Sequence, residues 1–145
     1  MRLLLDTSVL IEIERNNTAM AGRLLAYKKR EIGMSALCLT ELEVGVLLGR
    51  FHKRNRANLD ALVKQIKVLP FDATAAKAAS RLLAAHDLKG DRAQVFDALI
   101  AAHANSLKLP VACVDGDFNR FAIKKLSWAA SASTRKAATA AARQR

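Results

Sequence analysis

Four acidic residues are expected at strand ends or on apolar helix faces, where a carboxylate needs a counter-charge. Asp6 and Asp115 each follow a short apolar run, so each is expected at the carboxyl end of a strand. Glu41 and Asp97 each fall on an apolar stripe of an expected helix, away from its solvent side. If the four side chains converge, their repulsion and desolvation destabilise the fold unless a cation neutralises them. The pattern therefore favours a divalent cation held by carboxylates.

The ligand types indicate which cation this would be. The three histidines are scattered and the two cysteines have no CxxC spacing, so no zinc motif is present. A site made only of oxygen ligands suits Mg²⁺ or Mn²⁺. An ion held in this way activates a water for attack on phosphorus and needs no covalent nucleophile. Metal-assisted hydrolysis of a phosphodiester is the chemistry that the four acids predict.

Short apolar runs alternate with amphipathic segments along the chain. Strands are expected at residues 3–5, 32–35, 68–71, 109–114 and, at an edge, 126–128. Helices are expected at residues 7–15, 19–29, 36–50, 51–67, 72–86 and 94–107, with Asp72 or Thr74 capping the fifth. Strands that alternate with helices predict an α/β fold, an α/β/α sandwich with a short, mostly parallel central sheet.

Two of the acids gain specific expectations from this pattern. Glu41 shares a helical face with Leu37 and Val44, so it is expected to face the core. Asp97 is expected in the first turn of its helix, where unpaired backbone N–H groups stabilise an anion. Both positions bring a carboxylate toward the interior, where it needs a counter-charge.

Composition limits the class of protein. A chain of 145 residues that is 52% hydrophobic suits one packed domain, expected at residues 1–128. Residues 129–145 form a basic tail of low complexity, either disordered or helical only against a partner. No apolar run approaches the roughly 20 residues of a membrane span. Cys38 and Cys113 are expected to be reduced thiols in a cytoplasmic protein.

Positive charge is the strongest compositional feature. The 24 Lys and Arg residues against 13 Asp and Glu give a net charge of +11, and only four of these cations lie in residues 129–145. Such an excess favours a polyanionic partner, either a nucleic acid or an acidic protein. The densest cluster on an expected helix contains Lys53, Arg54 and Arg56, which are candidates for binding nucleic acid.

Four segments, in this order, resemble the motifs of PIN-domain ribonucleases, and more narrowly those of the VapC toxins of toxin–antitoxin pairs. They are Asp6-Thr7-Ser8, Ser35 with Thr40-Glu41-Leu42 and Gly45, the run from Asp97 to Ala104, and Val114-Asp115-Gly116-Asp117-Phe118. The resemblance extends over about residues 1–128. One departure is Cys113, which stands where many relatives have a Thr or Ser and is a weaker hydrogen-bonding group.

The resemblance implies a Mg²⁺-dependent endoribonuclease that acts on tRNA or another structured RNA, forms a homodimer and is inhibited by a small antitoxin. It makes Asp6 and Asp97 the principal metal ligands and Glu41 the acid that holds the metal or orients the attacking water. Asp115 is then the fourth acid, with Asp117 as the alternative. Ser8 is expected to hydrogen-bond the ligand shell.

Other functions remain open at this point. One is a PIN-like module that binds RNA without cutting it, and another is a PIN nuclease of RNA maturation that has no antitoxin. Enzymes that form an aspartyl-phosphate also place an Asp at a strand end. The haloacid-dehalogenase type needs a second Asp two residues later, where Ser8 stands, so this class is disfavoured.

Overall fold

Five short parallel strands form the centre of the molecule. The computed structural model describes residues 1–49, 55–86, 92–114, 116 and 118–128. The strands are β1 (Leu3–Leu5), β2 (Ile32–Ser35), β3 (Lys67–Leu69), β4 (Val111–Cys113) and β5 (Lys125–Ser127). They pair in the order β3-β2-β1-β4-β5, and every neighbouring pair is parallel. The mostly parallel sheet expected from the sequence is confirmed.

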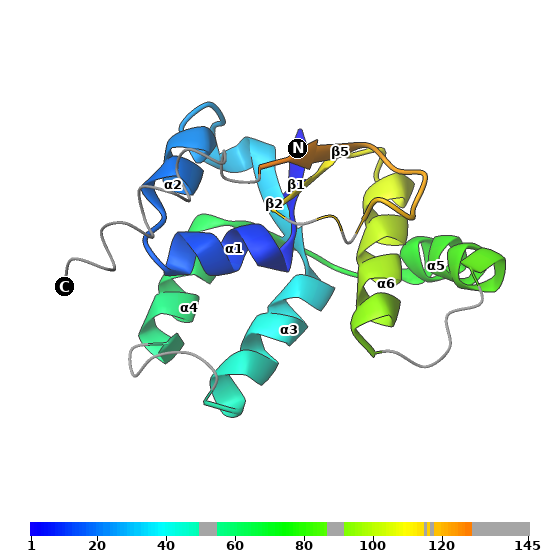
Figure 1. Ribbon diagram of the computed structural model, residues 1–145, viewed down its shortest axis with the longest axis horizontal. Helices are drawn as coiled ribbons and strands as arrows, with labels where there is room; N and C mark the ends of the chain where they lie inside the picture. Colours follow the sequence, from blue (N-terminus) through cyan, green and yellow to red (C-terminus); the bar gives the residue numbers. More distant parts are fainter. Residues whose placement is uncertain (50–54, 87–91, 115, 117, 129–145) are drawn as a thin grey trace.

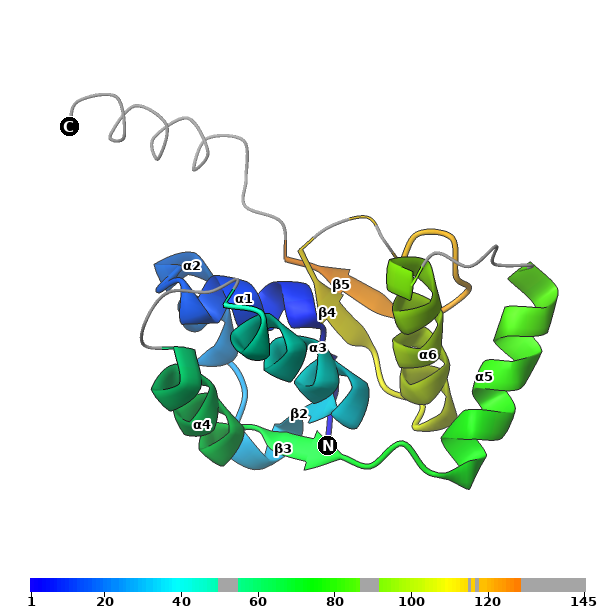
Figure 2. The ribbon, with the colours of Figure 1, turned by 90° about the horizontal axis from the view of Figure 1, so that it is seen from below.

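Helices flank this sheet on both sides. They are α1 (Thr7–Glu14), α2 (Thr18–Leu24), α3 (Ala36–Leu47), α4 (Asn55–Gln65), α5 (Ala73–His86) and α6 (Arg92–Ser106), with a 3-10 helix η1 (Lys29–Glu31) before β2. Figures 1 and 2 show α1, α2 and α4 on one side of the strands and the paired helices α5 and α6 on the other. Helix α3 extends beyond the carboxyl ends of β1 and β2, at the lower side of Figure 1.

Side-chain caps fix where several helices begin. Asp6 caps α1, Asn17 caps α2 and Ser35 caps α3, each by accepting a hydrogen bond from a backbone N–H of the first turn. At α5 the cap is Asp72 and not Thr74, since Asp72 Oδ1 accepts from the backbone N–H of Ala75 at 2.9 Å. Each such cap stabilises its helix by about 1 kcal/mol.

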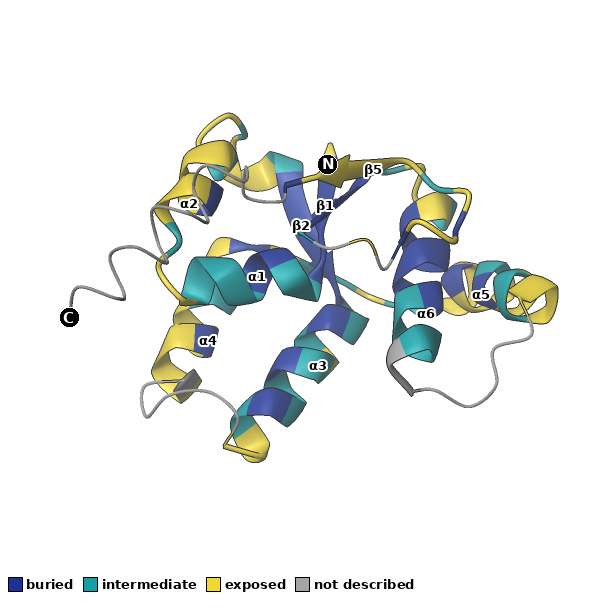
Figure 3. Ribbon diagram, in the orientation of Figure 1, coloured by how far each residue is buried: buried dark blue, intermediate teal, exposed yellow. Residues whose placement is uncertain are grey.

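The middle strands are covered on both faces. Leu3, Leu4 and Leu5 of β1 have no exposed surface, and neither do Val111 and Ala112 of β4. Figure 3 shows these strands as the buried centre, while the edge strand β5 is exposed. Continuous apolar runs of this kind are typical of parallel strands buried on both faces. None of the helices among the described residues is long and apolar enough to cross a membrane.

Two expectations about the helices carrying acids are wrong. Helix α6 begins at Arg92, so Asp97 is its sixth residue and lies beyond the first turn. In α3 the buried residues are Cys38, Leu42 and Gly45, whereas Leu37 and Val44, which share the face of Glu41, are only partly buried. The face of α3 that packs most tightly therefore passes beside Glu41 and not through it. Glu41 lies at the border of the core and is partly buried.

Other boundaries differ by smaller amounts. Strand β3 ends at Leu69, before Pro70, because proline has no N–H to continue the ladder. Helix α2 ends at Leu24, short of the expected Lys29. The expected helix at residues 51–67 is described from Asn55 as α4, and residues 51–54 lie outside the described part. The same holds for the expected tail at residues 129–145.

Candidate active site

Asp6 lies at the junction of β1 and α1 and is held by its neighbour Ser8. Only 5% of Asp6 is exposed. Its Oδ2 accepts a hydrogen bond from the Ser8 backbone N–H at 3.1 Å and another from the Ser8 hydroxyl at 2.6 Å. The Ser8 hydroxyl in turn accepts from the backbone N–H of Val114 at 3.1 Å. Ser8 therefore couples the carboxylate of Asp6 to the chain that leaves β4, the segment that leads to Asp115.

Glu41 is held by the adjacent hydroxyl, that of Thr7. The Thr7 Oγ1 donates to Glu41 Oε2 at 2.5 Å, which joins the first residue of α1 to the second turn of α3. Successive residues of a helix point about 100° apart, so neighbouring hydroxyls can serve two different acids. The pair Thr7 and Ser8 thus orients Glu41 and Asp6 separately.

The buried thiol of Cys38 is affected by the charges of both acids. Its thiol is fully buried, with Sγ 3.7 Å from the carbonyl oxygen of Leu5. Burial raises the pKa of the Cys38 thiol, and the negative charges of Asp6 and Glu41 raise it further. The sulfur is therefore protonated at neutral pH and does not offer a thiolate ligand beside the carboxylates.

Asp97 comes from the helix that contacts α3. It is partly buried on α6, and the first turns of α6 lie at the same end of the sheet as α3. Figure 1 shows α3 at the lower side of the molecule and α6 running alongside the sheet, with its first turns toward that side. Asp97 therefore lies on a helix that packs against the helix carrying Glu41, and its place among the metal ligands stays a prediction.

The fourth acid remains a prediction. Asp115 and Asp117 both lie outside the described residues, so the choice between them also stays open. Among residues 1–49, 55–86, 92–114, 116 and 118–128, no three His, Cys, Asp or Glu side chains are grouped closely enough to hold a metal ion. For Asp6 and Glu41, the structure shows that each accepts a hydrogen bond from one of two consecutive hydroxyls, Ser8 and Thr7.

Ser35 and His103 connect the two helices that carry Glu41 and Asp97. Both residues are buried, and His103 Nδ1 lies 2.9 Å from the Ser35 hydroxyl. The same hydroxyl accepts from the backbone N–H of Leu37 and so caps α3. The tautomer of the imidazole decides whether the ring or the Ser35 hydroxyl donates in this contact.

This arrangement favours a neutral imidazole. Burial lowers the pKa of His103, while the charge of Asp72 and the hydrogen bond to Pro70 act in the opposite direction with smaller effect. The edge of the ring packs against Phe71, with 5.4 Å between ring centroids. His103 therefore serves as a structural connection between α6 and the start of α3.

The predicted RNA-binding cations are only partly described. Lys53 and Arg54 lie outside the described residues. Arg56 donates two hydrogen bonds to the carboxylate of Glu43, at 2.8 and 2.6 Å, and lies 3.7 Å from Asp60. The ion pair with Glu43 raises the pKa of Arg56, so its charge already has an intramolecular partner. Binding of RNA by this group stays a prediction.

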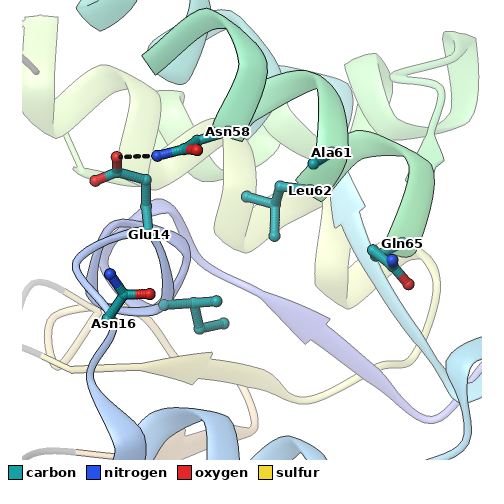
Figure 4. Close-up of a pocket in the computed structure, with 7 residues that line it drawn as sticks. Glu14, Asn16, Asn58, Ala61, Leu62 and Gln65 are labelled. Atoms are coloured by element: carbon teal, nitrogen blue, oxygen red, sulfur yellow. Dashed lines mark hydrogen bonds between the residues drawn. The ribbon is translucent and has the colours of Figure 1, made fainter. Parts of the chain in front are cut away.

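A hollow of about 460 Å³ lies elsewhere, between α1 and α4 (Figure 4). Ile13 and Leu62 contribute apolar surface, and Asn58 Nδ2 donates to Glu14 Oε1 at 3.2 Å. None of the acids predicted for catalysis lines it. The candidate active site is therefore the edge of the sheet and not this hollow.

The roles of Thr7 and of the Ser35–His103 pair were not anticipated from the sequence. All three residues belong to the motifs that carry the family resemblance, but only Ser8 was given a structural role. The sequence offered one further clue, two consecutive hydroxyls directly after an acid at a strand end. Which acid each hydroxyl meets depends on the packing of α3 against α1, which local sequence does not encode.

Comparison with known proteins identifies the family of this chain. The model of the PIN-domain family matches residues 3–124. A VapC from Shigella flexneri, named as a tRNA(fMet)-specific endonuclease, is 29% identical over 106 residues, 73% of this chain and 80% of that protein.

Solved structures give the same result. A DNA-bound VapBC from Salmonella typhimurium is 25% identical, with a TM-score of 0.76 over 88% of this chain and 98% of that one. VapBC2 from Rickettsia felis, bound to a DNA fragment from its promoter, is 20% identical, with a TM-score of 0.75 over 88% and 99%. The fold and the resemblance to VapC toxins expected from the sequence are confirmed. With a family model matched over most of its length, the chain belongs to the PIN-domain family.

Proposed function

We propose that this chain is a metal-dependent endoribonuclease and the toxin of a VapBC-type toxin–antitoxin pair. The observation that carries the proposal is that two consecutive hydroxyls of α1, those of Thr7 and Ser8, hold Glu41 and Asp6 where β1 ends. Ligands of open parallel sheets bind at this edge. The similarity to a VapC endonuclease supports RNA as the substrate.

The donor set fits a hard divalent cation. Asp6, Glu41 and Asp97, with Asp115 or Asp117, would hold Mg²⁺ or Mn²⁺ through oxygen alone, and the protonated thiol of Cys38 adds no soft ligand. When bound, the ion would supply Lewis-acid stabilisation of the phosphate and make a water more acidic.

The side chains of this protein provide the positioning. The Ser8 hydroxyl restricts the side chain of Asp6, and the Thr7 hydroxyl restricts that of Glu41. Glu41 is then placed to accept the proton of the attacking water or to orient it. Burial of Asp6 limits competition from bulk water for its carboxylate.

The partners follow from the same proposal. The RNA substrate would be a tRNA or another structured RNA, attracted by the net charge of +11. A small cognate antitoxin would keep the enzyme inactive, as the VapBC complexes among the similar structures suggest. We further propose that the protein is a homodimer that acts in the cytoplasm.

Cleavage of tRNA by the purified, antitoxin-free protein tests the proposal. The reaction is run with Mg²⁺, with Mn²⁺ and with EDTA, for the wild type and for Asp97→Asn, which keeps the size of the side chain and removes its charge. We expect cutting that requires the metal and is lost in the variant. A folded wild type that binds tRNA and leaves it intact with either metal would contradict the proposal and favour a non-catalytic RNA-binding module.

A further inference from the structure

Cations stand at the amino end of every strand of the sheet. Because all five strands are parallel, these ends lie along one edge, opposite the edge that holds Asp6. All of the cations are exposed, and they come just before a strand or begin it: Arg2, Arg30, Lys67, Lys108 and Lys125. The amino edge of the sheet therefore has a cation near the start of each strand, and Glu31, which pairs with Arg2, is the acid directly before β2.

The charge is concentrated in one hollow at the corner of this edge. The hollow measures about 420 Å³ and lies where η1, the end of α4 and the start of β3 meet. Four exposed cations line it, two from η1, one from α4 and one from β3, and no acid does: Lys29, Arg30, Lys64 and Lys67. We call these residues the basic hollow.

These four cations are available to a ligand. Within the described part of the chain, the ion pairs involve Arg2, Arg15 and Arg56 and none of the residues of the basic hollow. The nearby acids are already engaged, since Glu31 pairs with Arg2 and Asp60 with Arg56. Four like charges around one concave surface repel one another, so an anion bound there stabilises them.

The surface suits a phosphate backbone. Its floor is apolar, with Val63, Ile66 and Val68, over which the stems of lysines can lie while their ammonium groups reach solvent. Lysines act as point charges and make sequence-independent contacts with phosphates. The four residues of β2 separate this edge from the carboxyl edge by roughly 13 Å. A phosphate bound at the basic hollow is therefore a different group from the phosphate that would react at the carboxyl edge.

We propose that the basic hollow binds the phosphate backbone of the RNA substrate at a point remote from the cleaved bond. This inference rests on the proposed function for the identity of the ligand. It deepens that function by stating a substrate class, a structured RNA large enough to reach both edges of the sheet. A short oligonucleotide that occupies only the carboxyl edge gains nothing from the hollow.

Binding without cleavage tests this site separately from catalysis. Fluorescently labelled tRNA is titrated with the full chain in EDTA at several salt concentrations. The test variant is Lys64→Gln with Lys67→Gln. The matched control is Lys77→Gln with Arg81→Gln, which removes two exposed cations from α5. Thermal melts establish that both variants are folded.

We expect the test variant to bind tRNA about tenfold more weakly and to lower the slope of log K against log salt by roughly 1.4 to 1.8, as for two lost phosphate contacts. The control is expected to change affinity by less than about twofold. Equal losses in both variants would show that only net charge matters, and unchanged binding in the test variant would exclude the hollow. Either result overturns the proposal.

Two further arms separate this proposal from its alternatives. With Mg²⁺ present, the test variant should show a raised KM for tRNA, an unchanged kcat and normal cleavage of a short oligonucleotide. A wild type that does not cut tRNA, but whose binding depends on the basic hollow, would refute the nuclease and keep the site. Displacement of tRNA by polyglutamate at equal charge concentration would instead assign the hollow to an acidic protein and overturn the RNA proposal.

Discussion

The two edges of the central sheet are built from the same five strands and differ in both charge and construction. At the carboxyl edge, Asp6 and Glu41 are at least partly buried, and each is fixed by a hydroxyl. At the amino edge, the cations of the basic hollow are exposed and are not part of any ion pair within the described residues. Parallel pairing produces this separation, because it places all strand starts on one side and all strand ends on the other.

The difference in construction indicates a difference in role. A carboxylate held by short hydrogen bonds has a defined position, which chemistry at a phosphate needs. An exposed lysine attracts a polyanion without a defined geometry, and salt screens the attraction. Conservative changes should therefore damage the carboxyl edge strongly, and only the removal of charge should affect the amino edge.

The largest expected effect is that of Asp6→Asn. We expect cleavage of tRNA to fall by at least about 100-fold, since loss of a ligand should exceed the 10–100-fold cost of losing its supporting contacts. Asparagine caps a helix as well as aspartate does, so α1 should remain intact. Asp72→Asn is the matched control, because Asp72 also caps a helix but lies in an exposed position on α5. Equal activity of the two variants would contradict the role of Asp6.

Removal of the supporting hydroxyls should have the next largest effect. Thr7→Val keeps the shape of the side chain but leaves Glu41 without its donor, so we expect kcat or the affinity for Mn²⁺ to fall about 10- to 100-fold. Thr7→Ser should restore most of the loss because it returns the hydroxyl. Thr40→Val is the control, since the Thr40 hydroxyl bonds only within α3. A Thr7→Ser variant as impaired as Thr7→Val would indicate a packing role instead.

The buried connection behind the carboxyl edge should make stability depend on pH. The pKa of His103 is lowered in the folded protein, so the unfolded chain binds more protons between that pKa and the ordinary value of 6.5. Stability is then fully present above about pH 6.5 and is lost as the pH falls through the folded pKa. Melting of the wild type and of His103→Gln at pH 7.5 and 5.5 measures this. A wild-type midpoint that falls no more than that of the variant would contradict it.

The smallest expected effect is that of Arg56→Gln. Because Glu43 and Asp60 already pair with this guanidinium, its removal should change the affinity for tRNA by less than about twofold. The measurement is the same titration in EDTA. A loss as large as that of Lys64→Gln with Lys67→Gln would indicate that RNA binds at Arg56. It would also show that ion-paired cations contribute as much to RNA binding as the cations of the basic hollow.

Much of this organisation was predictable from the sequence. The apolar run Leu3–Leu5 predicts the first strand, because a buried parallel strand is apolar throughout. It also predicts that Asp6 lies at the carboxyl end of this strand. The four motifs gave the family. Glu41 was placed near the interior, although the buried face of α3 proved to run through Cys38 and Leu42.

What could not be predicted depends on tertiary packing. The start of α6 has no clear signal in the sequence, so Asp97 is expected two residues closer to the start of its helix than the structure places it. The partners of Thr7 and His103 lie 34 and 68 residues away, at distances along the chain that local patterns do not reach. The basic hollow joins η1, α4 and β3, whose cations appeared in the sequence as separate exposed charges.

Steady-state cleavage of tRNA by two variants compared side by side tests the separation of roles most directly. The account predicts that Asp97→Asn loses kcat while its affinity for tRNA in EDTA is kept. It predicts that Lys64→Gln with Lys67→Gln keeps kcat and raises KM. If both variants lose kcat alone, or both raise KM alone, the two edges of the sheet do not divide catalysis from RNA attraction.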